Sequence, residues 1–193
     1  SFERPNLSYS IFKVESRAAR LVEILQKVPG TAIVYCKTRK KTREFAALLE
    51  AHKINAACYH AGLAQDDRKE RQEKWIRNEI RVMVCTNAFG MGIDKPDVQL
   101  VVHTDPRDCL ENYYQEAGRA GRDGKKAYAV LLYHSTDLAE MEKLADMRYP
   151  SMDIIRKVYQ SLANYLQMPS GLGEDASYAF DIQDLIKKFN LPL

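Results

Sequence analysis

The sequence predicts an α/β domain in which a parallel sheet is covered by helices on both faces. Residues 31–36 form a short, continuous apolar run that is typical of a strand buried on both faces, and residues 81–85 and 98–103 are further expected strands. Along most of the chain, expected strands alternate with segments of helical periodicity, and such alternation indicates βαβ units and therefore a parallel sheet. Because ligand sites in parallel sheets gather where strands end, we expect functional residues to follow the strands.

The first part of the chain predicts three strands and three helices in alternation. Pro5 disfavours a helix at the start, and the partly alternating residues 7–14 predict the first strand. Ser16 can cap a helix that runs to about Lys27, where a Pro-Gly pair ends it. The elements that follow the strand at 31–36 are a helix through Phe45, Leu48 and Leu49, a strand at 55–59, a turn at 60–63 and a charged helix at about 66–78.

The next part predicts three more strands and the end of the domain. The strands at 81–85 and 98–103 precede a helix that carries a glycine- and arginine-rich stretch, and a last strand follows at 128–133. Ser135 can cap a helix that runs to about Arg148.

The pair Tyr149-Pro150 indicates a domain boundary. We therefore expect one domain at 1–148 and a helical tail, or the start of an accessory domain, at 149–193. In this tail Ser151 can cap one amphipathic helix, and another begins near Asp181.

Composition sets broad limits on function. A chain of 193 residues with a net charge of +3 suits one domain plus a fragment, and this charge permits nucleic-acid binding without arguing for it. Without a signal peptide or a long apolar run, we expect a cytoplasmic protein with no membrane partner. The four cysteines form no Cys-x-x-Cys pair, so buried thiols are expected rather than disulfides or a zinc site.

The stretch from residue 113 to 124 carries the strongest chemical signal. Gln115, Arg119 and Arg122 are spaced at i, i+4 and i+7, so in a helix all three would lie on one face. Gly118 and Gly121 remove side-chain bulk between them, and arginine forks fit phosphate oxygens. The pattern indicates a nucleotide phosphate site, whereas the alternative is a pair of solvated arginines at a helix end.

Two other segments suggest anion contacts. Residues 37–43 hold five cations within seven positions at an expected helix start, where cations are electrostatically disfavoured unless an anion is near. The alternative is a solvated first turn. In residues 86–96, Gly90 and Gly92 permit a tight turn after a strand. Asp94 in this segment is either part of a binding site or an ordinary turn residue. Trp75 is expected in the core rather than as a base-stacking platform.

Three motifs, in the same order as in the family, resemble those of superfamily two helicases. Gln-Glu-Ala-Gly-Arg-Ala-Gly-Arg-Asp-Gly resembles the last motif in its RecQ form, Tyr-Cys-Lys-Thr-Arg resembles the fourth, and residues 86–96 resemble the fifth. The resemblance covers residue 1 to about residue 148 and implies a RecA-like fold. The chain lacks a Gly-x-x-x-x-Gly-Lys-Ser/Thr loop and an Asp-Glu-x-His segment, so it resembles only the second RecA-like domain.

The resemblance implies a role for each motif residue. Arg122 would be an arginine finger on the γ-phosphate of ATP, with Arg119 as a second phosphate contact and Gln115 in the same catalytic group. Gly92 and Asp94 would line the nucleotide cleft. The residues implied in contacts with the DNA backbone are Thr38, Arg39, His60 and Thr86.

The expected function is that of the C-terminal motor domain of a RecQ-type, ATP-dependent 3′–5′ DNA helicase. The implied partners are single-stranded and partly duplex DNA and a preceding RecA-like domain, which would hold most of the contacts to ATP and Mg²⁺. This chain alone is therefore expected to be inactive. Alternatives are an RNA helicase of the same superfamily or a non-catalytic nucleic-acid-binding domain. The family commonly has a four-cysteine zinc module next, but residues 149–193 contain no cysteine.

Overall fold

The computed structural model describes residues 4–90, 93–169 and 177–191, and the chain divides into two compact units. The first unit is Ser1–Leu138 and the second is Ala139–Leu193. The division lies inside helix α5 (Ser135–Arg148), ahead of the boundary that the Tyr-Pro pair suggested.

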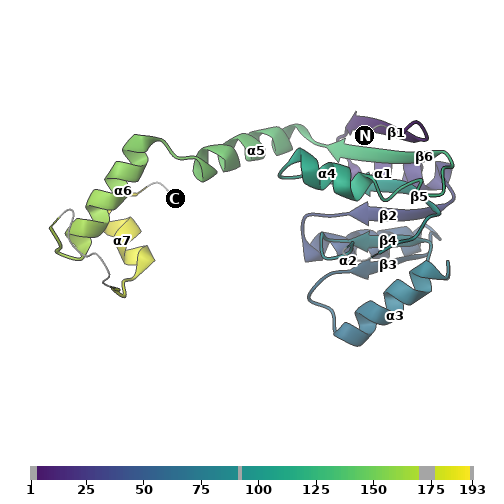
Figure 1. Cartoon of the computed structure of the whole chain (residues 1–193), viewed down its shortest axis with the longest axis horizontal. Coiled ribbons are helices and arrows are strands. Elements are labelled where there is room, and N and C mark those ends of the chain that lie inside the picture. The colour runs from purple at the N-terminus through teal and green to yellow at the C-terminus, as the bar shows by residue number, and fades with distance from the viewer. Residues whose placement is uncertain (1–3, 91–92, 170–176, 192–193) are drawn as a thin grey trace. The chain divides into compact units, whose positions relative to one another are not determined.

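A parallel sheet forms the centre of the first unit, as predicted (Figure 1). Among the described residues it has six strands in the order β1-β6-β5-β2-β4-β3, so β1 and β3 are the edge strands. All pairings are parallel. The strands are β1 (Leu7–Lys13), β2 (Thr31–Tyr35), β3 (Ala56–Tyr59), β4 (Val82–Cys85), β5 (Val98–His103) and β6 (Ala127–Tyr133).

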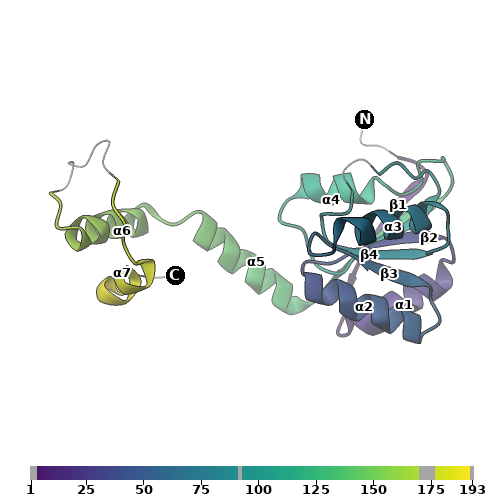
Figure 2. The same ribbon diagram turned by 90° about the horizontal axis from the view of Figure 1, so that it is seen from below.

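Helices cover both faces of this sheet (Figure 2). Helices α1 (Arg17–Lys27) and α2 (Arg39–Ala51) lie on one face, and α3 (Gln65–Ile76) and α4 (Leu110–Ala117) lie on the other. Ser16 caps α1 as expected, because its hydroxyl accepts the backbone N–H of Ala19.

The alternation of side chains along each strand builds one apolar core on either face. In β2, Ala32 and Val34 face the core under α1 and α2, whereas Ile33 and Tyr35 face the opposite core. Trp75 is fully buried in the second core and donates its indole N–H to the carbonyl of Ala32 at 3.3 Å. The prediction that this tryptophan is a core residue is confirmed.

The helix that carries the glycine- and arginine-rich stretch ends earlier than the spacing predicted. Helix α4 stops at Ala117, and Gly118 forms its C-cap. Gly121 has a φ of +66°, in the left-handed region, and its N–H donates to the carbonyl of Val98 at 2.8 Å. The prediction of one helical face for Gln115, Arg119 and Arg122 was therefore wrong, because the two arginines leave from turns beyond the helix.

The cysteines differ in burial but are all free. Burial raises the pKa of Cys36 to about 12 and also raises the pKa of Cys85, so both thiols stay uncharged. Cys58 is partly buried, and Cys109 is exposed at the N-cap of α4, which corrects the prediction that all four are buried.

The second unit contains helices α6 (Met152–Tyr165) and α7 (Ile182–Phe189). Both begin as predicted: Ser151 caps α6, and Asp181 caps α7 by accepting the N–H groups of Gln183 and Asp184. The two helices are joined by a hydrogen bond of 2.8 Å from the Tyr165 hydroxyl to Asp184. Among the described residues, no helix is long and apolar enough to cross a bilayer.

Candidate nucleotide and nucleic-acid sites

A cavity of about 860 Å³ lies beside α4 in the first unit. Residues that follow β2, β4 and β5 line it together with α4 and the turn beyond that helix, so the site lies largely where strands end. Four residues predicted from the sequence line this cavity, which we call the arginine pocket: Asp94, Gln115, Arg119 and Arg122. The predicted residue Gly92 lies outside the described residues.

Arg122 is held in the pocket by an ion pair with Asp94 that a ligand can replace. Its Nη1 lies 2.8 Å from Oδ1 of Asp94, and the two side chains are 38% and 84% exposed. An ion pair so exposed contributes only about 0–1 kcal/mol, because water screens both charges. A phosphate that enters the pocket can therefore displace Asp94 at little cost.

The guanidinium of Arg119 packs closely against the backbone at Gly90. A Cβ at Gly90 would lie 2.5 Å from Nη2 of Arg119. The Nε of Arg119 is buried and has no hydrogen-bond partner among the described residues. Since an unpaired buried donor on a cation is costly, this atom is suited to an anion in the pocket.

A third arginine, which the sequence did not single out, forms the pocket wall. Arg107 follows β5, and its Nε donates to Oε2 of Glu116 at 2.6 Å. The side chains of Arg107 and Glu116 are only 11% and 10% exposed, and the guanidinium lies over the ring of Tyr35. The Nη2 of Arg107 has no partner among the described residues. The sequence signal that could have identified Arg107 was its position just after a predicted strand.

Glu116 also binds a buried histidine, which ties α4 to β5. Nε2 of His103 lies 2.9 Å from Oε2 of Glu116. Burial lowers the pKa of His103, although the hydrogen bond to Glu116 opposes this, so the ring is neutral at pH 7 and donates from Nε2. Glu116 thereby holds Arg107 and His103 with one carboxylate oxygen. Glu116 follows Gln115 directly in the sequence, but nothing in the sequence indicated that it would contact Arg107 and His103.

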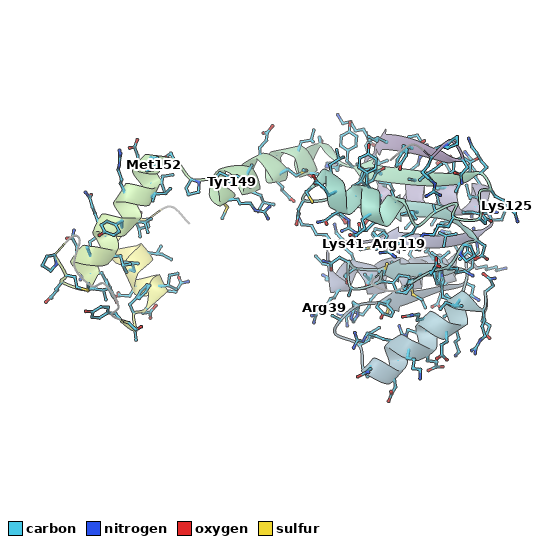
Figure 3. All side chains as sticks on the ribbon, viewed as in Figure 1. Arg39, Lys41, Arg119, Lys125, Tyr149 and Met152 are labelled. Carbon is cyan, nitrogen blue, oxygen red and sulfur yellow. The ribbon has the colours of Figure 1, made fainter. Side chains whose placement is uncertain are left out.

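The basic residues at 37–43 differ in their contacts. Lys41 Nζ donates to Asp105 at 2.5 Å, and the N–H of Lys37 also donates to this carboxylate. Burial by itself would raise the pKa of Asp105, but the hydrogen bonds from Lys41 and Thr104 outweigh it and hold that pKa below its ordinary value. Arg39 is exposed, and Figure 3 shows Arg39 and Lys41 at the end of the sheet opposite to Lys125.

The residues assigned to DNA contacts form a separate group, which we call the strand-end surface: Thr38, Arg39, His60 and Thr86. The backbone links two of their loops, because the N–H of Thr86 donates to the carbonyl of Tyr59 at 3.2 Å. Arg39 lies against Gly62, where a Cβ would be 2.8 Å from Nη1. Thr38 caps α2 by accepting the N–H of Lys41.

His60 is the unexpected member of this surface, because it is buried. Its two ring nitrogens have no hydrogen-bond partner among the described residues. Burial lowers its pKa, and the nearby charges of Arg43 and Arg39 lower it further. The DNA contacts assigned to the strand-end surface remain predictions.

The sequence matches the family model of the helicase conserved C-terminal domain over residues 16–124. The chain belongs to this helicase family. It is 45% identical over 138 residues to the ATP-dependent DNA helicase RecQ of Bacillus subtilis, which covers 71% of this chain and 23% of that protein. It is 40% identical over 153 residues to the ATP-dependent DNA helicase Q1 of Pongo abelii, covering 76% of this chain and 24% of that protein.

These comparisons confirm the RecQ resemblance of this helicase C-terminal domain. The chain spans about a quarter of the length of these curated relatives. A candidate ATP-dependent RNA helicase of Acanthamoeba polyphaga mimivirus is also similar, with 43% identity over 71% of this chain and 25% of that protein.

Solved structures agree on the fold of this helicase domain. A DEAD box protein from Methanococcus jannaschii has a TM-score of 0.61 at 27% identity and covers 72% of this chain and 40% of its own. The Escherichia coli DEAD-box protein SrmB, bound to the regulator of ribonuclease activity A, has a TM-score of 0.60 at 29% identity, covering 68% of this chain and 78% of its own. The predicted RecA-like fold is confirmed.

The pocket of this helicase domain fits nucleotide phosphates better than it fits a metal ion. Arg107 and Arg119 each have a buried donor without a hydrogen-bond partner among the described residues, and the partner of Arg122, Asp94, can be displaced. Within the described ranges, no group of three His, Cys, Asp or Glu side chains could hold a metal ion. The residues present therefore suit the anionic part of ATP and do not by themselves form a Mg²⁺ site.

Proposed function

We propose that this chain is the second motor domain of a RecQ-type, ATP-dependent DNA helicase that moves 3′ to 5′ along DNA. The observation that carries the proposal is the arginine pocket, where three guanidinium groups converge with few internal partners. Such a set of cations is suited to the triphosphate of ATP. A preceding RecA-like domain would hold most of the contacts to ATP and Mg²⁺.

In this proposal Arg122 is the arginine finger. Its charge stabilises the γ-phosphoryl group as negative charge redistributes during transfer, and Arg119 binds a second phosphate oxygen. Asp94 holds Arg122 until ATP is bound and then contacts the ribose. Gln115 on α4 orients the reacting groups from the same pocket.

The strand-end surface would be part of the track for single-stranded DNA. The exposed guanidinium of Arg39 and the hydroxyls of Thr38 and Thr86 suit contacts to phosphates, which do not depend on base sequence. ATP hydrolysis supplies the free energy that moves this surface along the strand. We place the protein in the cytoplasm, in DNA repair and recombination, with partly duplex DNA as substrate.

Steady-state ATP hydrolysis by the complete helicase tests the proposal. We expect single-stranded DNA to stimulate turnover, whereas RNA should not. Stimulation by RNA alone would assign the protein to RNA helicases, an alternative that the mimivirus relative favours. Absence of hydrolysis under all conditions would mean that the fold serves binding only. The isolated chain should not hydrolyse ATP, because it has no phosphate loop.

A further inference from the structure

The short segment before β1 fastens the turn that carries Arg122. Nη2 of Arg4 donates to the carbonyl oxygens of Ala120 at 3.0 Å and Gly121 at 2.7 Å. Nδ2 of Asn6 donates to the carbonyl oxygens of Gly121 at 2.7 Å and Lys125 at 2.9 Å. We call residues 4–6 the strap. It links positions that are more than a hundred residues apart in the chain.

The two anchor points of Asn6 bracket the arginine. Gly121 precedes Arg122 and Lys125 follows it by three positions, so one amide group holds both sides of the turn. The fit is close, because a Cβ at Gly121 would lie 2.6 Å from Nδ2 of Asn6. Without the strap, the carbonyls of Ala120 and Gly121 would lose these side-chain donors.

The strap is itself fixed by the sheet. The N–H of Ala127, the first residue of β6, donates to the carbonyl of Asn6 at 2.9 Å, and the N–H of Leu7 donates to that of Arg4 at 3.0 Å. The turn is held from its other side by bonds from Gly121 to Val98 and from Asp123 to Pro96. The arginine turn is therefore clamped between the start of β1 and the start of β5.

We propose that Arg4 and Asn6 are positioning residues for Arg122 in ATP hydrolysis. Neither side chain lines the arginine pocket, so both act through the backbone of the turn. The inference rests on the proposed function, because it assumes that Arg122 acts on the transferred phosphoryl group. Misplacement of a catalytic group by about 1 Å can cost roughly 100-fold in rate, so loss of a clamp should reduce turnover rather than binding.

The sharpest test is Asn6→Asp in the complete helicase. The carboxylate has the shape of the amide but no N–H groups, and it would face the carbonyl oxygens of Gly121 and Lys125. We expect kcat for DNA-stimulated ATP hydrolysis to fall about 10-fold or more. The KM for ATP and the Kd for single-stranded DNA should stay within about two-fold, because the pocket and the strand-end surface are intact.

Asn55→Asp is the matched control. Nδ2 of Asn55 also donates to a backbone carbonyl, that of Glu79, at 2.7 Å, but Asn55 precedes β3, the strand at the opposite edge of the sheet from β1. We expect a comparable loss of thermal stability in both variants and an unchanged kcat in Asn55→Asp. An equal loss of kcat in the control would mean that the effect of Asn6→Asp is general destabilisation, and the inference would be overturned.

A second pair of variants keeps the inference testable if Asn6→Asp does not fold. Arg4→Lys retains a donor for one of the two carbonyls, whereas Arg4→Ala retains none, so kcat should fall in the order parent, Arg4→Lys, Arg4→Ala. Equal kcat in all three would refute the positioning role. Arg122→Ala separates the two proposals: if it hydrolyses ATP normally, the proposed function fails, and if only Arg122→Ala is inactive, the positioning inference alone fails.

Discussion

The arginine pocket and the strand-end surface both present arginines, but they differ in how tightly those arginines are held. In the pocket, Arg107 is buried against Glu116 and Tyr35, and the turn of Arg122 is clamped by the strap. On the strand-end surface Arg39 is exposed, and its neighbour His60 is buried and lacks a hydrogen-bond partner among the described residues.

This difference matches the demands of the two proposed tasks. Stabilising a transition state needs a charge at a fixed position, so small displacements are costly. Holding a DNA backbone needs only charge near phosphates, and each contact adds a modest, salt-dependent amount. Changes in the pocket should therefore have large effects on turnover, whereas changes on the surface should have small effects on binding.

The largest effect is expected for Arg122→Ala. In the complete helicase, kcat for ATP hydrolysis should fall by about 10³–10⁵, because the finger acts mainly in the transition state, while ATP and DNA binding change little. Arg77→Ala is the control, since it removes an exposed arginine that pairs with Glu79 and does not line the pocket. Normal DNA unwinding by Arg122→Ala would show that the pocket does not work as proposed.

The next largest effect is expected on stability, at the buried pair of Arg107 and Glu116 in the pocket wall. Glu116→Gln leaves Arg107 without its carboxylate, and breaking such a buried pair should lower the free energy of unfolding by about 3 kcal/mol. Urea unfolding followed by the fluorescence of Trp75, the one tryptophan of the chain, reports on this unit. Glu111→Gln, on the exposed part of the same helix, should cost less than about 1 kcal/mol. Equal losses in the two variants would contradict the assigned role of Glu116.

A smaller effect is expected on the strand-end surface. Arg39→Ala should weaken single-strand binding a few-fold and reduce the slope of log K against log salt by about 0.7, because one phosphate contact is lost. Thr86→Ala should weaken binding without a change in this slope, since no charge is removed. Arg77→Ala removes an exposed arginine that pairs with Glu79, and it serves as the control. An unchanged slope for Arg39→Ala would make Arg39 an ordinary solvated residue.

The smallest effect is a pH dependence of stability. Burial lowers the pKa of both His60 and His103, so the unfolded chain binds more protons than the folded chain. Stability from these groups is complete above their unfolded pKa of about 6.5 and decreases as the pH falls through that value. Urea unfolding between pH 5 and 7, about the range in which histidine titrates, should show this decrease, and His60→Gln should reduce it. A stability that rises toward pH 5 would contradict the assignment.

Local patterns were sufficient for most of the fold. Ser16, Ser151 and Asp181 cap the helices that the sequence predicted, because a cap is a contact across only two or three residues. The strand at residues 31–36 was evident because residues that face two cores must be apolar on both sides. The motif residues that meet in the pocket were likewise predicted, from the motifs that resemble the family.

What local patterns could not supply were contacts between distant segments. Helical spacing suggested a continuous helix through Arg122, yet the chain turns after Ala117, and the carbonyl of Val98 holds Gly121 in its left-handed conformation. Arg107 gave no signal beyond its position after a strand, because its partner Glu116 is on another element.

The sequence by itself determined the parallel sheet, its covering helices and the family, because apolar periodicity, caps and motif spacing are all encoded over short stretches. Only the tertiary structure decided which polar groups meet. The bond of Asn6 to Gly121, the burial of His60 and the contact of Glu116 with His103 all depend on how the strands are ordered in the sheet. That order joins β1 to β6 and β6 to β5, which brings the strap at the start of the chain to the arginine turn near residue 120.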